Sequence, residues 1–139
     1  MESLAQILDG IEYGEQESKL SYLNLLNDQI EFKQLSIEDL LYAAEKLISL
    51  VVYESDAQVK AQIFRCLENI LLNPASIDLD LSDLIHAMPN DEVLAANTLL
   101  LIALSARSGY IPLVKTYLNH SNEFIQKNAQ YAIKHLEKI

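Results

Sequence analysis

Residues 56–70 read DAQVKAQIFRCLENI, and this stretch decides the fold. Its apolar residues recur at intervals of three and four, which places them along one face of a helix. They are Val59, Ile63, Cys66, Leu67 and Ile70. Asp56 is of the type that accepts hydrogen bonds from the unpaired N–H groups at a helix start. Pro74 disfavours helix for the residue before it, so we expect a helix that begins at Asp56 and ends near Asn73.

This pattern recurs twice later in the chain, at periods of 34 and then 32 residues. The aligned positions are Val59, Val93 and Ile125 at the start of the apolar face, with Asp56, Asn90 and Asn122 three residues before. The preceding helix repeats too, through Leu47, Leu81 and Leu113 and, four residues on, Val51, Ile85 and Tyr117. A helix pair of this kind cannot bury its apolar faces alone, whereas stacked pairs form one continuous core. The repeat therefore predicts an α-solenoid.

The N-terminal third also has helical periodicity, but it does not share this register. One apolar face comprises Leu4, Ile7, Leu8 and Ile11, a second comprises Leu20, Leu23, Leu26 or Asn27, and Ile30, and a third comprises Leu40, Ala44, Leu47 and Val51. Gly14 is expected to stop the first helix, Ser36 to cap the third, and Tyr53 to lie at the third helix's end. With three glycines and three prolines, the chain has too few turn signals for a many-stranded β fold. We expect an all-α chain of about eight helices.

The last helix pair of the chain resembles a HEAT repeat, in its first helix as well as in its second. The matching residues are Tyr110 to Val114, Tyr117, Leu118, Asn122, Ile125, Ala129, Ala132, Ile133 and Leu136. The resemblance covers about residues 40–138 and implies a short right-handed α-solenoid of antiparallel helix pairs. It implies one domain over 1–139, with a divergent N-terminal cap pair over 1–35 and repeat pairs over about 36–73, 77–107 and 109–138. In the second helix of a HEAT repeat, a basic residue typically follows the valine that starts the apolar face. Lys60 matches this position, but the later units have Leu94 and Gln126 there.

The charge is strongly acidic and unevenly distributed. The formal net charge is −10, and residues 1–56 hold twelve acidic and three basic side chains, whereas residues 93–139 hold two acidic and five basic ones. Such a charge repels phosphate backbones and anionic lipid and favours a basic protein partner. We therefore expect no direct binding of nucleic acid. The acidic part is either a solvated surface that favours solubility or a docking face, and the sequence leaves both open.

The sequence favours a cytoplasmic location. The single cysteine, Cys66, is the usage expected in a reducing compartment. Met1-Glu2-Ser3 has no positive n-region, and the longest apolar run, Leu99 to Leu104, is far shorter than the ~20 residues of a membrane span. We expect neither secretion nor membrane insertion.

A search for catalytic and metal-binding motifs is negative. The chain has no Gly-rich phosphate loop, HExxH, CxxC or GxSxG, and its histidines, His86, His120 and His135, have no metal-ligand spacing. Asp78, Asp80, Ser82 and Asp83 resemble the start of a calcium loop, but the loop's glycine is replaced by Asp83 and its glutamate by Pro89. Cys66 lies at a repeat-core position and is expected to be a buried, inert thiol. We expect no enzyme, cofactor, metal ion or small-molecule substrate.

Two surfaces are candidates for binding a protein. On the third helix, the stripe opposite the core holds Glu38, Tyr42, Glu45 and Ser49, an acidic and aromatic composition suited to an interface. Tyr42 either anchors a partner or packs against the preceding helix. The second candidate is the exposed side of the second helices of the repeats, and its residues are Gln62, Arg65, Asn69, Tyr131 and His135.

Small, acidic, helical-repeat chains without catalytic residues resemble some bacterial immunity proteins of contact-dependent growth inhibition and related polymorphic toxin systems. That resemblance implies a basic nuclease toxin domain as partner, with carboxylates of the inhibitor in place of nucleic-acid phosphates. Two alternatives stay open. One is a HEAT-like adaptor or assembly factor without a toxin partner. The other is a HEAT-like lyase-type enzyme, which would need a basic groove or a ligand pocket with a placed acid.

Overall fold

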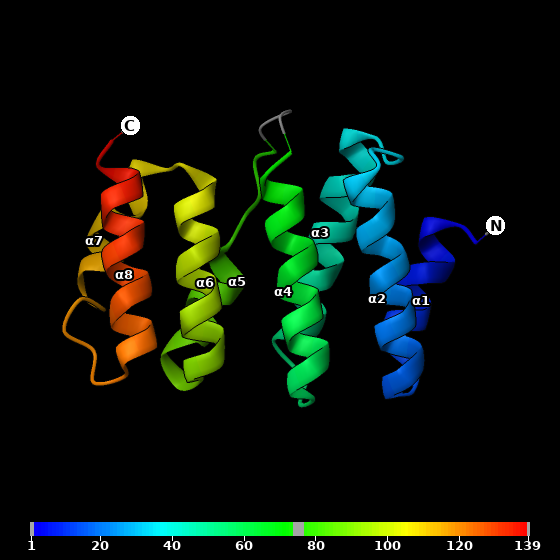
Figure 1. Ribbon diagram of the computed structural model, residues 1–139, viewed down its shortest axis with the longest axis horizontal. Coiled ribbons are helices and arrows are strands. Elements are labelled where there is room, and N and C mark those ends of the chain that lie inside the picture. The colour runs from blue at the N-terminus through cyan, green and yellow to red at the C-terminus, as the bar shows by residue number, and fades with distance from the viewer. Residues whose placement is uncertain (1, 74–76, 139) are drawn as a thin grey trace. The chain divides into compact units, whose positions relative to one another are not determined.

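The computed structural model describes residues 2–73 and 77–138, which form eight α-helices and two short 3₁₀ helices and contain no β-strand (Figure 1). The predicted all-α class is confirmed. The chain divides into two compact units, Met1–Leu79 and Asp80–Ile139. Within the described residues, no helix is both long enough and apolar enough to cross a membrane.

The first unit contains four helices, α1 (Leu4–Tyr13), α2 (Gln16–Glu31), α3 (Ile37–Val51) and α4 (Ala57–Leu71). Helix α2 packs against α1 and α4, and α3 packs against the same two helices. The predicted apolar faces form this core, with only Leu4 and Leu20 left half-buried. The third and fourth helices each end two residues before the expected end, and Pro74 lies outside the described residues.

Polar caps fix the starts of these helices. The Ser3 hydroxyl accepts a hydrogen bond from the Gln6 N–H, the Ser36 hydroxyl accepts one from the Asp39 N–H, and the Asp56 carboxylate accepts one from the Val59 N–H. Each bond satisfies one of the N–H groups that a helix start leaves unpaired. The caps predicted at Ser36 and Asp56 are therefore confirmed, and Gly14 follows α1 as expected.

The second unit is built around two longer helices, α6 (Glu92–Ser105) and α8 (Glu123–Leu136), which pack against each other. The helices that precede them are much shorter: α5 (Ser82–Ala87) contacts α6, and α7 (Ile111–Lys115) contacts α8. Two 3₁₀ helices, η1 (Met88–Asn90) and η2 (Ser108–Tyr110), lie beside them. The leading helices predicted for this unit are only six and five residues long, and two of the residues that defined them lie outside: Leu81 directly precedes α5, and Tyr117 follows α7.

The register predicted for α6 is wrong by one residue. Asp91, not Asn90, caps this helix, because its carboxylate accepts hydrogen bonds from the N–H groups of Val93 and Leu94. Val93 is 49% exposed whereas Leu94 is 2% exposed. Asn90 instead ends the 3₁₀ turn that contains Pro89, so α6 begins one residue later than expected. Because α6 is apolar on nearly every side, its sequence fits more than one register.

A buried hydroxyl in α6 provides a stability test. Thr98 is fully buried, and its Oγ1 has no hydrogen-bond partner among the described residues. We expect Thr98→Val to raise the free energy of unfolding by about 1–2 kcal/mol, because it removes an unpaired polar group at nearly constant shape. Urea unfolding measures the change. Thr116→Val is the matched control, since that exposed hydroxyl donates to the Leu113 carbonyl. A less stable Thr98→Val protein would contradict the assignment.

Candidate protein-binding face

The predicted stripe of α3 lies on the surface of the first unit. Glu38, Tyr42, Glu45 and Ser49 are all exposed, and the residues of the opposite stripe are buried. Tyr42 is 55% exposed. Its side chain is therefore available to a partner rather than covered by the preceding helix.

The two glutamates of this stripe have no oppositely charged partner in the part of the chain that the structure describes. Among the described residues, neither Glu38 nor Glu45 forms an ion pair. The stripe can therefore bind a basic group without breaking an internal contact.

An ion pair between α1 and α3 borders the stripe. Lys46 Nζ lies 2.7 Å from Glu12 Oε1. The hydrogen bond from Lys46 lowers the pKa of Glu12, and the same bond raises the pKa of Lys46. Tyr13 and Tyr42 add smaller contributions in the same direction to the pKa of Lys46, which places both tyrosines near its ammonium group. Tyr13 is 79% exposed, so it extends the aromatic surface from α3 to the end of α1.

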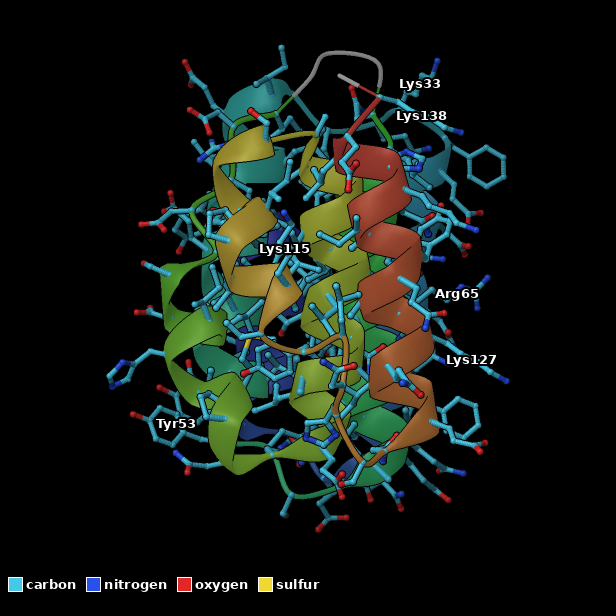
Figure 2. The ribbon with its side chains drawn as sticks, turned by 90° about the vertical axis from the view of Figure 1, so that its left-hand side faces the viewer. Lys33, Tyr53, Arg65, Lys115, Lys127 and Lys138 are labelled. Atoms are coloured by element: carbon cyan, nitrogen blue, oxygen red, sulfur yellow. The ribbon has the colours of Figure 1, made fainter. Side chains whose placement is uncertain are left out.

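A hollow of about 510 Å³ adjoins the C-terminal end of the stripe. Its lining comprises Ile11, Glu12, Lys19, Ser49, Leu50, Tyr53, Glu54, Ser55 and Ile63, all from the first unit. Tyr53 is 89% exposed and extends away from the ribbon (Figure 2). The tyrosine and the hollow together give this face both an aromatic projection and a recess.

Glu54, in the lining of this hollow, is held in place by three hydrogen bonds. One carboxylate oxygen lies 3.0 Å from Lys19 Nζ, and the other accepts hydrogen bonds from the N–H groups of Ser55 and Asp56. Burial alone would raise the pKa of Glu54, but the hydrogen bonds from Asp56, Lys19 and Ser55 outweigh it, so the pKa lies below its ordinary value of 4.5. Lys19 comes from α2, and the bond therefore ties the loop between α3 and α4 to another helix.

The lowered pKa of Glu54 makes part of the stability dependent on pH. A carboxyl group with a lowered pKa stabilises the fold above its unfolded pKa, and this contribution is lost as the pH falls through the folded value. We expect Glu54→Gln to lower the free energy of unfolding by about 1–2 kcal/mol at pH 7, and by much less in acid below the folded pKa. Urea unfolding at both pH values tests this, with Glu45→Gln as control. An equal loss at both pH values would show that the charge of Glu54 is not responsible.

The second predicted surface is divided between the two units. Gln62, Arg65 and Asn69 lie on α4, whereas Tyr131 and His135 lie on α8, with ring centroids 5.4 Å apart. Asn69 donates a hydrogen bond to the amide oxygen of Asn27, a buried residue of α2. Arg65 is exposed, and its guanidinium lies 3.9 Å from the carboxylate of Glu31. On α4, therefore, Asn69 holds two helices together, and Arg65 and the half-buried Gln62 are the more accessible residues.

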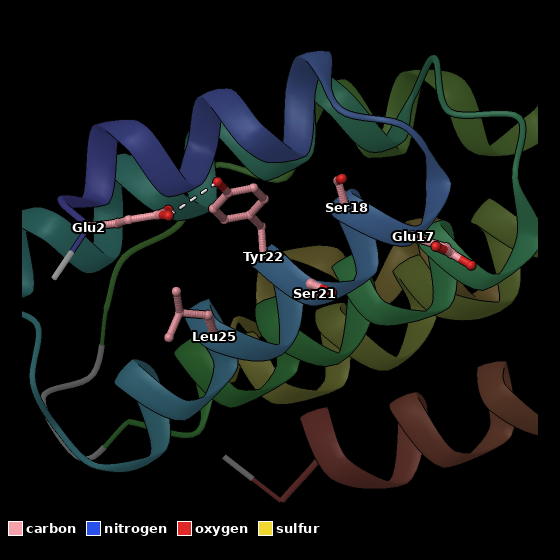
Figure 3. Close-up of a pocket in the computed structure, with 6 residues that line it drawn as sticks. All are labelled: Glu2, Glu17, Ser18, Ser21, Tyr22 and Leu25. Atoms are coloured by element: carbon pink, nitrogen blue, oxygen red, sulfur yellow. Dashed lines mark hydrogen bonds between the residues drawn. The ribbon is translucent and has the colours of Figure 1, made fainter.

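A second hollow of the first unit, of about 460 Å³, lies beside α1 and α2 (Figure 3). Tyr22 crosses α1 at Gly10, where any Cβ would collide with the tyrosine ring. The Tyr22 hydroxyl donates a hydrogen bond to Glu2 at 3.3 Å. The tyrosine hydroxyl that lines this hollow therefore already has a hydrogen-bond partner within the protein.

The residues considered for chemistry occupy structural positions. Cys66 is 1% exposed, its thiol donates to the Leu23 carbonyl, and burial raises its pKa to about 12. Asp80 accepts a hydrogen bond from the Ser82 N–H at the start of α5. Over residues 2–73 and 77–138, no group of three or more His, Cys, Asp or Glu residues could hold a metal ion.

Sequence reasoning missed Tyr13 and Tyr53 as exposed neighbours of the α3 stripe, and it missed Glu54 as part of the adjoining hollow. Tyr13 and Tyr53 lie at helix ends and outside the apolar stripes, which was a usable signal that they are exposed. No sequence signal places Glu54 against Lys19, because the two residues are 35 apart in the chain. Comparison of the chain with protein-family models, with curated proteins and with solved structures gave no match.

Proposed function

We propose that this chain is a protein-binding module and that its partner is a basic protein. The docking face consists of Glu38, Tyr42, Glu45 and Ser49 on α3, with Tyr13 and Tyr53 beside them; we call it the α3 face. The observation that carries the proposal is the presence of exposed tyrosines next to carboxylates that form no ion pair with the described residues. Tyrosine is enriched among the residues that dominate binding energy at interfaces.

The charge of the chain supports a basic partner. The formal net charge is −10, and residues 1–79 hold fourteen acidic and five basic side chains. Complementary charge speeds the encounter of two proteins and selects against partners of like charge. Added salt should therefore slow association more than it speeds dissociation.

Most specifically, we propose an immunity protein that neutralises a basic nuclease toxin. A nuclease surface that binds phosphates is basic, so an acidic protein face can occupy it with carboxylates in place of phosphates. Size, charge and helical composition support this assignment. The reducing environment of the cytoplasm suits the unpaired Cys66.

The finer architecture belongs to the same proposal. We infer that successive helices run antiparallel as pairs and that the pairs stack into a short right-handed solenoid. Within the first unit α2 packs against α4, and within the second α6 packs against α8, which is the contact expected between second helices of neighbouring repeats. Each of these four helices also contacts the helix before it in the chain.

Capture of the partner, followed by a nuclease assay, tests the function. The chain is immobilised and exposed to the product of the gene next to its own, and RNA and DNA cleavage by that product is measured with and without the chain. Inhibition of a basic nuclease, together with protection of cells that express it, supports the immunity proposal. A basic partner without nuclease activity supports the adaptor alternative instead. No binding of any basic protein would overturn the proposal.

A further inference from the structure

We propose that the α3 face recognises arginine in preference to lysine, through a seat made of Glu38, Tyr42 and Glu45. This inference rests on the proposed binding of a basic protein and specifies which of its side chains the face selects. We call these three residues the Tyr42 seat.

The spacing of the three residues sets the geometry of the seat. Glu38 precedes Tyr42 by four residues and Glu45 follows it by three, within a single helix. Side chains three or four residues apart are neighbours on a helix surface. The ring of Tyr42 therefore lies between two carboxylates, one on each side along the helix axis.

Each part of the seat is accessible. Tyr42 is 55% exposed, and both glutamates are exposed without an ion pair to any described residue. The nearby ammonium group of Lys46 is held by Glu12 at 2.7 Å, so an internal partner already engages it. An incoming cation thus meets an aromatic face and two carboxylates that no internal cation neutralises.

This combination suits a guanidinium group better than an ammonium group. A guanidinium is planar, so it stacks on the tyrosine ring while its edge donates two parallel hydrogen bonds to a carboxylate. The ammonium group of lysine is a compact point charge that is more strongly hydrated and has no flat face to stack. A charged surface without an aromatic ring would attract both cations, so the tyrosine provides the discrimination.

Tyr131 on α8 provides a matched contrast. It is 47% exposed, close to the exposure of Tyr42, but Lys127 and Lys134 lie four residues before it and three residues after it. These are the same offsets at which Tyr42 has its glutamates. Replacing Tyr131 therefore changes an exposed aromatic residue of similar accessibility without changing the seat.

The test compares two short peptides, one of alternating glycine and arginine and one of alternating glycine and lysine. Their affinities for the full chain are measured at low salt by NMR chemical-shift titration. We expect the arginine peptide to bind about three- to fivefold more tightly. Tyr42→Phe should keep this preference, Tyr42→Leu should remove it, and Tyr131→Leu should leave it unchanged. Circular dichroism of each variant checks that the helices are intact.

The outcomes separate this inference from the proposed function. Equal affinity for both peptides would overturn arginine selection and leave the basic partner in place. A preference that persists in Tyr42→Leu, or that disappears in Tyr131→Leu, would overturn the seat. Failure of both peptides to bind the wild-type chain would overturn the α3 face as a site for basic groups, and with it both proposals.

Discussion

Replacing Phe64 by alanine is expected to lower the free energy of unfolding by about 3–5 kcal/mol. Phe64 lies in α4 and is 1% exposed, among the largest fully buried side chains of the described residues. Helix α4 packs against both α2 and α3, and the substitution would leave a cavity in the core of the first unit. Such a loss is a large fraction of the 5–15 kcal/mol by which small domains are typically stable.

Urea unfolding measures this loss, and Phe124→Ala is the matched control. Phe124 is 75% exposed, and surface substitutions usually change stability by no more than ~0.5 kcal/mol. The single thiol, Cys66, is buried two residues from Phe64 and provides a second readout. Its reaction with a thiol reagent should be very slow in the wild-type protein and markedly faster in Phe64→Ala. Equal stability losses in the two phenylalanine variants would contradict the assigned core.

Reversing both charges of the seat, in a Glu38→Lys, Glu45→Lys variant, is expected to weaken binding of the basic partner about 10- to 100-fold. The substitution replaces two attractions by two repulsions at the centre of the α3 face. Most of the loss should appear in the association rate at low salt and should shrink as salt is added. Surface plasmon resonance at several salt concentrations separates the two rates.

The matched control is Glu123→Lys, Glu137→Lys, which changes the net charge equally. Glu123 lies in the first turn of α8, as Glu38 lies in the first turn of α3, so both variants lose the same favourable interaction with a helix N-terminus. If the control weakened binding as much as the seat variant, binding would depend on overall charge and not on the α3 face.

The sequence predicted the helices of the first unit well because local signals agreed there. Apolar periodicity indicated the helices, Ser36 and Asp56 indicated the starts of α3 and α4, and Gly14 indicated the end of α1. Helices α1, α3 and α4 end within two residues of the expected positions. The register predicted for α6 was wrong for a physical reason. An almost entirely apolar helix has no polar face from which its orientation can be predicted. In addition, Asn90 belongs to the 3₁₀ turn that contains Pro89, so the capping residue of α6 is Asp91 and not Asn90.

The exposed stripe of α3 could be predicted because the residues that face the core of a helix determine which residues lie on its opposite side. Once Leu40 and Leu47 were assigned to the core, Glu38, Tyr42 and Glu45 had to face the other way. The surroundings of the stripe could not be predicted, because they depend on which helix packs beside α3. The structural role of Asn69 was missed for the same reason, since its partner Asn27 is 42 residues away in the chain.

Amide hydrogen exchange of the chain with and without its basic partner tests the central claim most directly. We predict slower exchange in α3 and in residues 52–55 when the partner is bound, with exchange in α8 unchanged. Slower exchange confined to Asp80–Ile139, with α3 unaffected, would contradict the assignment of the docking face.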